Sequence, residues 1–90
     1  MKQIELVIHG NVQGVFFRDF VCKEAEALCI AGWVRNEPDG TVRVVAQSGE
    51  AFLKKFAKRI ERGTDLSRVD FVSMVWQSPA ETFTGFEIVQ

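Results

Sequence analysis

The stretch from Gly10 to Arg18, Gly-Asn-Val-Gln-Gly-Val-Phe-Phe-Arg, contains the residues whose types and spacing favour a binding chemistry. It follows an alternating apolar run and precedes an amphipathic run, so it is expected to be a turn from a strand into a helix. Its two glycines allow several backbone N–H groups to point into one concavity, and the helix N-terminus adds about half a positive charge. This combination is typical of a site for an anion such as phosphate.

Arg18 favours the same interpretation. A cation in the first turn of a helix is disfavoured by about 0.3–1 kcal/mol. An anion held between the loop and the guanidinium removes this conflict and can accept paired hydrogen bonds from the planar fork. The plainer alternative is that the glycines serve only a tight turn and that the arginine is solvated. The loop is not a Walker A motif, because no Gly-Lys-Ser/Thr follows it.

The composition restricts the classes of partner. The 90 residues carry a formal net charge of −1 without a block of like charge, which argues against binding to nucleic acid or to an acidic membrane. No apolar run has the length of a transmembrane helix, and the N-terminus lacks the apolar core of a signal peptide. We therefore expect residues 1–90 to form one soluble, monomeric, cytoplasmic domain that binds neither nucleic acid nor membrane.

The histidine and the two cysteines provide few options for metal or acid–base chemistry. His9 is either a base beside the loop or a solvated residue at a strand end, and the second interpretation is preferred. Cys22 and Cys29 are placed on one predicted helix about 10 Å apart along its axis, beyond the ~7 Å limit of a disulfide. We expect both thiols to be reduced and packed on the helix. We expect no metal and no cofactor, because the chain has no Cys-x-x-Cys pair.

Alternation and helical periodicity predict the elements that position the loop. Strands are expected at residues 3–9, 33–36, 41–46, 69–76 and 83–89. One helix is expected at residues 17–28. The second is expected to begin after an N-cap at Ser48 and to bury a stripe of Phe52, Leu53, Phe56, Ala57 and Ile60. The lysines of that helix are interpreted as its solvated side, in preference to an RNA-binding face.

Two local patterns give more detailed expectations. The turn at Glu37-Pro38-Asp39-Gly40 has the chemistry of a β-hairpin, with proline followed by Asp-Gly. In the strand at 69–76, strict alternation divides the side chains between two faces. One face is expected to carry Val69, Phe71, Ser73 and Val75, and the other Asp70, Val72, Met74 and Trp76.

The order β-α-β-β-α-β, with a possible short extra strand, indicates an α+β, ferredoxin-like sandwich. Two helices that each bury one stripe must cover one face of a mixed, mainly antiparallel sheet of four or five strands. This fold supports many functions. An RNA-recognition module would need stacking aromatics on the strand at 41–46, which has none. A copper carrier would need paired cysteines in the first loop, which are also absent.

Two motifs resemble those of the acylphosphatase family. The family pattern Gly-x-Val-Gln-Gly-Val-x-Phe-Arg matches residues 10–18. The pattern Gly-aromatic-small-x-Asn, three residues, then Gly-x-Val matches residues 32–42. The resemblance extends over nearly the whole chain and includes the order of elements. The chain departs from the family at Phe16, Cys29, Gly49 and the loop at 63–69. Of these only Phe16 lies in the first motif, where altered packing or substrate access is expected.

The resemblance implies metal-free hydrolysis of the carboxyl–phosphate bond of acyl phosphates. It assigns phosphate binding to the backbone amides of Gln13, Gly14, Val15, Phe16, Phe17 and Arg18. The Arg18 side chain would clamp the phosphoryl group, and Asn36 would hold the attacking water. A carboxylate leaves readily, so no protein acid is needed, and inorganic phosphate or sulfate should compete for the loop. The alternative for Asn36 is a side chain that caps the hairpin turn.

Two hypotheses for the whole chain follow. The first is a free-standing acylphosphatase. The second is a non-catalytic ferredoxin-like module that binds an anion or a protein, and the chain also resembles a domain of a larger carbamoyl-transferring hydrogenase-maturation protein. The length of 90 residues and the presence of both Arg18 and Asn36 favour the free enzyme.

Overall fold

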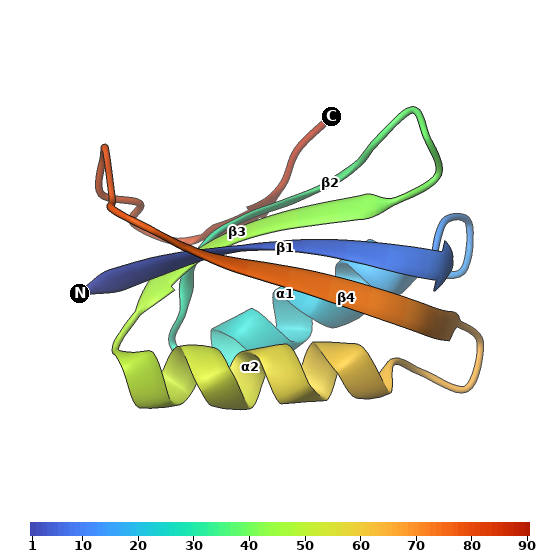
Figure 1. The fold of residues 1–90 in the computed structure, drawn as a ribbon, viewed down its shortest axis with the longest axis horizontal. Coiled ribbons are helices and arrows are strands. Elements are labelled where there is room, and N and C mark those ends of the chain that lie inside the picture. Colours follow the sequence, from blue (N-terminus) through green and yellow to red (C-terminus); the bar gives the residue numbers. More distant parts are fainter.

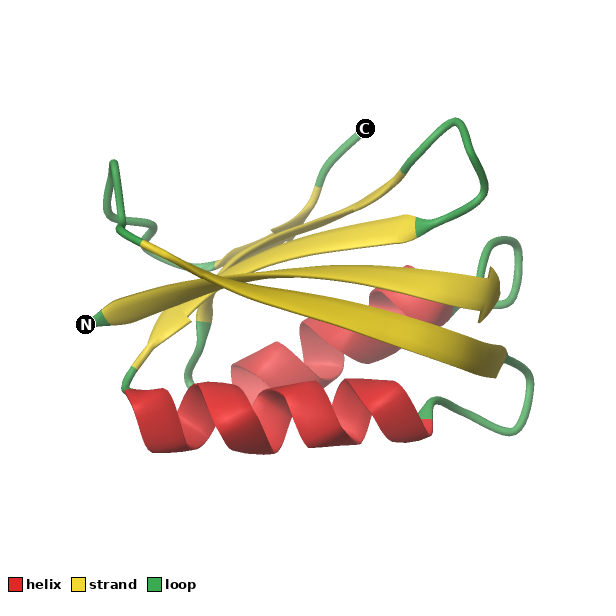
Figure 2. Ribbon diagram, in the orientation of Figure 1, coloured by secondary structure: helices red, strands yellow, loops and turns green.

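Two helices cover one face of a five-stranded sheet in the computed structural model, which describes residues 1–90 (Figures 1 and 2). The elements follow in the order β1 (Lys2–Asn11), α1 (Phe17–Ala27), β2 (Ala31–Asn36), β3 (Val42–Ser48), α2 (Glu50–Arg62), β4 (Arg68–Gln77) and β5 (Phe86–Ile88). The strand order is β4-β1-β3-β2-β5, and only the β2–β5 pair is parallel. The expected ferredoxin-like sandwich with a mixed, mainly antiparallel sheet is confirmed. Neither helix has the length and hydropathy needed to cross a membrane.

The core lies between the sheet and the helices. Period-two alternation in β1 and β3 and helical stripes in α1 and α2 direct their apolar side chains into this layer. The fully buried members include Ile4, Leu6, Ile8, Val42, Val44, Ala46, Phe17, Val21, Ala25, Leu53, Phe56 and Ile60. Each large side chain contributes roughly 1.5–3 kcal/mol through its burial. This core fixes the position of β1 and α1, which the Gly10–Arg18 loop connects.

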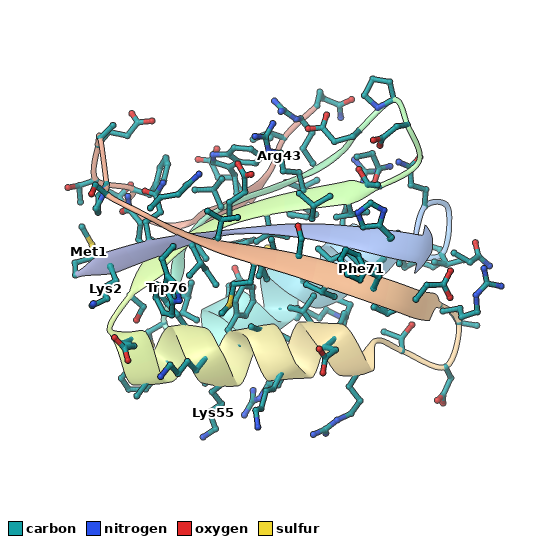
Figure 3. All side chains as sticks on the ribbon, viewed as in Figure 1. Met1, Lys2, Arg43, Lys55, Phe71 and Trp76 are labelled. Atoms are coloured by element: carbon teal, nitrogen blue, oxygen red, sulfur yellow. The ribbon has the colours of Figure 1, made fainter.

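The second helix differs from its prediction at its first turn. Its N-cap is Gly49, with no side-chain cap, so the expected cap at Ser48 is wrong. Phe52 is 52% exposed, because it lies outside the arc formed by the buried residues of α2. The lysines lie on the solvated side as expected, and Figure 3 shows Lys55 pointing away from the sheet.

The side chains of β4 do not alternate strictly between the two faces of the sheet. His9 pairs with Phe71 but Gly10 pairs with Val69, so Asp70 is an extra residue in the ladder. A bulge of this kind exchanges the two faces beyond it. Val69 and Val72 therefore both pack against the core, although they were expected on opposite faces. The bulge depends on pairing with β1, which residues 69–76 alone do not reveal.

The end of α1 also differs from its prediction. Cys29 was placed on the helix, but it lies beyond Ala27, is exposed, and has a φ of 57°. This left-handed conformation favours glycine. Cys22 is half-buried on α1 and donates a hydrogen bond to the carbonyl of Phe86 at 3.7 Å. Burial raises the pKa of its thiol.

The last strand is shorter than the 83–89 expected. Only Phe86–Ile88 pairs with β2. Before it, the amide of Phe83 donates to the side chain of Gln47 at 3.0 Å, and the carbonyl of Gly85 accepts from Gly32. These bonds bring the last residues of the chain along β2 toward Asn36.

Candidate active site

Three residues of the Gly10–Arg18 loop have a positive φ, and the first of them is Gly10 at 140°. Gly14 has a φ of 75°, and Phe16, the N-cap of α1, has φ 61° and ψ 24°. No carbonyl or side chain of the protein accepts a hydrogen bond from the backbone amides of residues 13–19. Unpaired amides at the start of a helix form a binding site for an anion. The loop therefore has the geometry that the glycine pattern predicted.

A cavity of about 390 Å³ opens over this loop. It is lined by Val12, Gly14, Phe16, Phe17, Arg18, Asp19, Asn36, Ile88 and Gln90. Arg18 from α1 and Asn36 from the end of β2 thus border the same space, as the assigned roles require. The volume suffices for a small phosphorylated ligand.

Arg18 is half-buried in the wall of this cavity. It takes part in none of the ion pairs of the protein, whereas Arg43 and Arg59 are each paired with a glutamate. Asp19, the acidic residue of the first helical turn, lies beside it in the cavity wall. Arg18 and the unpaired amides are therefore the hydrogen-bond donors available at this cavity.

Asn36 lines the cavity, and its side-chain oxygen is buried. Its Oδ1 has no hydrogen-bond partner in the protein. A buried polar atom without a partner costs roughly 1–3 kcal/mol, so it calls for a ligand or water. The alternative role of Asn36 as a cap for the hairpin turn is not supported, because this oxygen accepts no bond from the turn.

Asp39 closes the hairpin turn instead. Its carboxylate accepts hydrogen bonds from the hydroxyl of Thr41 at 2.6 Å and from the amide of Thr41 at 3.0 Å. These bonds hold the pKa of Asp39 below its usual value, so the carboxylate keeps its charge at neutral pH. The hairpin is confirmed at residues 37–41, where Gly40 has a φ of 93°.

Gln13 connects the loop to this hairpin. Its side-chain amide donates to the carbonyls of Glu37 and Thr41, both at 2.9 Å. The sequence assigned only the backbone amide of Gln13 to the site and gave no signal for these acceptors. The bridge holds the Gly10–Arg18 loop beside the strand that carries Asn36.

Two further groups of residues complete the description. Ile88 and Gln90 line the cavity from the C-terminal segment, which the sequence reasoning did not include in the site. His9 lies on the face of the sheet opposite the core, with its ring 5.2 Å from that of Phe71, and it does not line the cavity. The interpretation of His9 as a solvated strand-end residue is therefore supported. No three His, Cys, Asp or Glu side chains gather as a potential metal site.

The ferredoxin-like sandwich brings an arginine and unpaired amides to one cavity, an arrangement that suits a protein that binds a small anion. The family model Acylphosphatase matches residues 4–88. The acylphosphatase of Bacillus licheniformis is 41% identical over 88 residues, covering 98% of each chain. The crystal structure of acylphosphatase from Bacillus subtilis covers 100% of both chains with a TM-score of 0.96 and 37% identity. The chain belongs to the acylphosphatase family and is a hydrolase that acts on acyl phosphates.

One further similarity concerns a much larger protein. A crystal structure of full-length HypF in the phosphate- and nucleotide-bound form matches with a TM-score of 0.84 and 28% identity. The match covers 99% of this chain but 12% of that one. The same kind of domain thus occurs within a longer polypeptide, in line with the resemblance found in the sequence.

Proposed function

We propose that the chain cleaves acyl phosphates with the loop amides and Arg18 holding the phosphoryl group and Asn36 holding the attacking water. The observation that carries this assignment is that Asn36, whose buried Oδ1 has no partner in the protein, lines the same cavity as Arg18, which forms no ion pair. Oδ1 can accept a hydrogen bond from a water molecule, and the guanidinium can donate hydrogen bonds to a phosphate.

The chemistry follows from these positions. The amides of residues 13–18 and the Arg18 guanidinium donate to the phosphoryl oxygens, where charge shifts during transfer. Asn36 Oδ1 accepts one hydrogen of the water, and this directs an oxygen lone pair at phosphorus. The new O–P bond forms as the bond to the acyl oxygen breaks, and the carboxylate leaves with the electron pair. The water proton passes to a phosphoryl oxygen, so no protein base is required.

The proposal also covers the domain organisation, the location, the oligomeric state and the substrate of the protein. We assign residues 1–90 to one acylphosphatase domain that acts as a cytoplasmic monomer on a small acyl phosphate. A net charge of −1 without a basic surface run supports a small-molecule substrate over nucleic acid or an acidic membrane. The presence of both Arg18 and Asn36 at one cavity supports catalysis over a purely anion-binding role.

Chelation is expected to leave activity unchanged. Arg18 and the loop amides supply the positive charge that a divalent ion supplies in other phosphoryl-transfer enzymes. The measurement is release of inorganic phosphate from benzoyl phosphate with and without EDTA. Loss of activity with EDTA, followed by recovery on adding a divalent ion, would contradict the metal-free mechanism.

Inorganic phosphate is expected to inhibit competitively and to bind at the loop. The amides of residues 14–18 lack partners in the protein, so a bound anion should shift their NMR resonances. The amide of Leu53, paired inside α2, serves as the control and should not move. Saturating phosphate that leaves the resonances of residues 14–18 in place would show that the anion binds elsewhere.

A further inference from the structure

A second hollow adjoins the phosphate cavity on its other side. It has a volume of about 360 Å³ and is lined by Val15, Phe16, Asp19, Phe20, Lys23, Thr64 and Leu66. Phe16 and Asp19 line both spaces, so the two spaces lie next to each other. We call this space the side hollow. Its walls come from the Gly10–Arg18 loop, from α1, and from the α2–β4 connection.

Two large apolar side chains from different loops meet at the side hollow, although both are exposed. Phe16 is 74% exposed and Leu66 is 65% exposed. Exposed apolar groups that gather at a concave surface next to a binding site indicate contact with a ligand. Phe16 also holds a left-handed backbone, which is uncommon for a bulky residue and is found at ligand sites. Phe16 lines both spaces.

The in-line geometry of phosphoryl transfer places the acyl group of the substrate on the side of this hollow. In phosphoryl transfer the attacking and leaving oxygens lie roughly on opposite sides of phosphorus. With the water at Asn36, the leaving carboxylate points away from the β2 side of the cavity. At one end of the molecule the loop after β1 lies between the β2–β3 turn and the α2–β4 connection (Figure 1). The α2–β4 connection carries Leu66, and the side hollow contains no residue of β2.

We infer that the side hollow binds the acyl part of the substrate and that it favours an apolar, especially aromatic, acyl group. The inference rests on the proposed function, because it uses the position of Asn36 relative to the phosphoryl group. An aromatic acyl group offers more apolar area to Phe16 and Leu66, which both line the side hollow, than an acetyl group does. Apolar area removed from water in this way lowers the free energy of the bound state.

The test compares two substrates in a Leu66→Ser variant. The ratio of kcat/KM for benzoyl phosphate to kcat/KM for acetyl phosphate should fall about fivefold, the scale of one or two lost apolar groups. Phe52→Ser is the matched control. Phe52 is another exposed apolar residue and lies on α2, outside both spaces. The ratio should be the same in the control as in the unaltered protein. An unchanged ratio in folded Leu66→Ser would overturn the inference.

A binding measurement separates this inference from the proposed function. Benzoylphosphonate, an unreactive analogue with the acyl carbon bonded to phosphorus, should shift both the Gly14 amide and the Leu66 methyl resonances. Inorganic phosphate should shift only the Gly14 amide. A shift of the Gly14 amide without a shift of the Leu66 methyls would overturn the assignment of the side hollow to the acyl group, and it would support the phosphate site. Absence of both shifts, or failure of the unaltered protein to hydrolyse either substrate, would contradict the proposed function itself.

Discussion

Replacing Arg18 with alanine is expected to lower kcat/KM for an acyl phosphate by about 10²–10³-fold, the scale of a lost charge-stabilising donor. The same change should weaken binding of inorganic phosphate, because the guanidinium contacts phosphoryl oxygens that are present in both the ground state and the transition state. Arg18 has no ion pair in the protein, so its removal leaves no buried carboxylate without a partner. Steady-state kinetics and the inhibition constant of phosphate measure the two effects.

Arg62→Ala is the control for this experiment. Arg62 lies at the end of α2, is exposed, and lines none of the cavity. It changes the net charge of the protein by the same amount, so it reports any general electrostatic effect. Both variants should retain the circular dichroism spectrum of the unaltered protein. Near-normal phosphate affinity in Arg18→Ala would show that the guanidinium is not part of the anion site.

Asn36→Ala is expected to lower kcat by about 10²-fold or more while the affinity for phosphate changes by less than about threefold. This pattern indicates an interaction made only in the transition state. Asn36 is assigned to the water and not to the phosphate, so its loss should not affect the bound product. The kcat value and the phosphate inhibition constant, measured on the same preparation, distinguish this variant from Arg18→Ala.

The stability of Asn36→Ala provides a second readout. A side chain that closed the turn would lose about 1 kcal/mol of unfolding free energy on truncation. Oδ1 of Asn36 has no partner in the protein, and Asp39 closes the turn, so no such loss is expected. Urea unfolding measures this free energy. A folded variant with near-normal turnover would show that Asn36 does not position the attacking water.

Local patterns were sufficient to predict most of the fold and the centre of the candidate site. Alternation in β1 and β3 and the stripes of α1 and α2 are set by burial against one layer, so they are visible in the sequence. The glycines at 10 and 14 and the Asp-Gly pair at 39–40 mark backbone shapes that few other residues adopt. For this reason the loop and the hairpin were located correctly. The roles of Arg18 and Asn36 came from the family resemblance and stay predictions.

The features that were missed depend on partners far away in the chain. The bulge at Asp70 exists only in register with β1, and the acceptors of Gln13 become available only when the hairpin lies beside the loop. The approach of Gln90 to the cavity depends on the pairing of β5 with β2. Cys29 shows a different limit, because its left-handed conformation is usually marked by glycine and here is not.

The Gln13 bridge ties the binding site to the folding of the whole sheet. Its acceptors lie 24 and 28 residues along the chain, so the loop is held in place only after the β2–β3 hairpin has docked beside β1. A partly folded chain would thus lack the arrangement that holds an anion. A ligand that binds only the native state stabilises it, by about 2.7 kcal/mol at a free concentration of one hundred times its Kd. Inorganic phosphate, the product of the reaction, would in this way also protect the enzyme against unfolding.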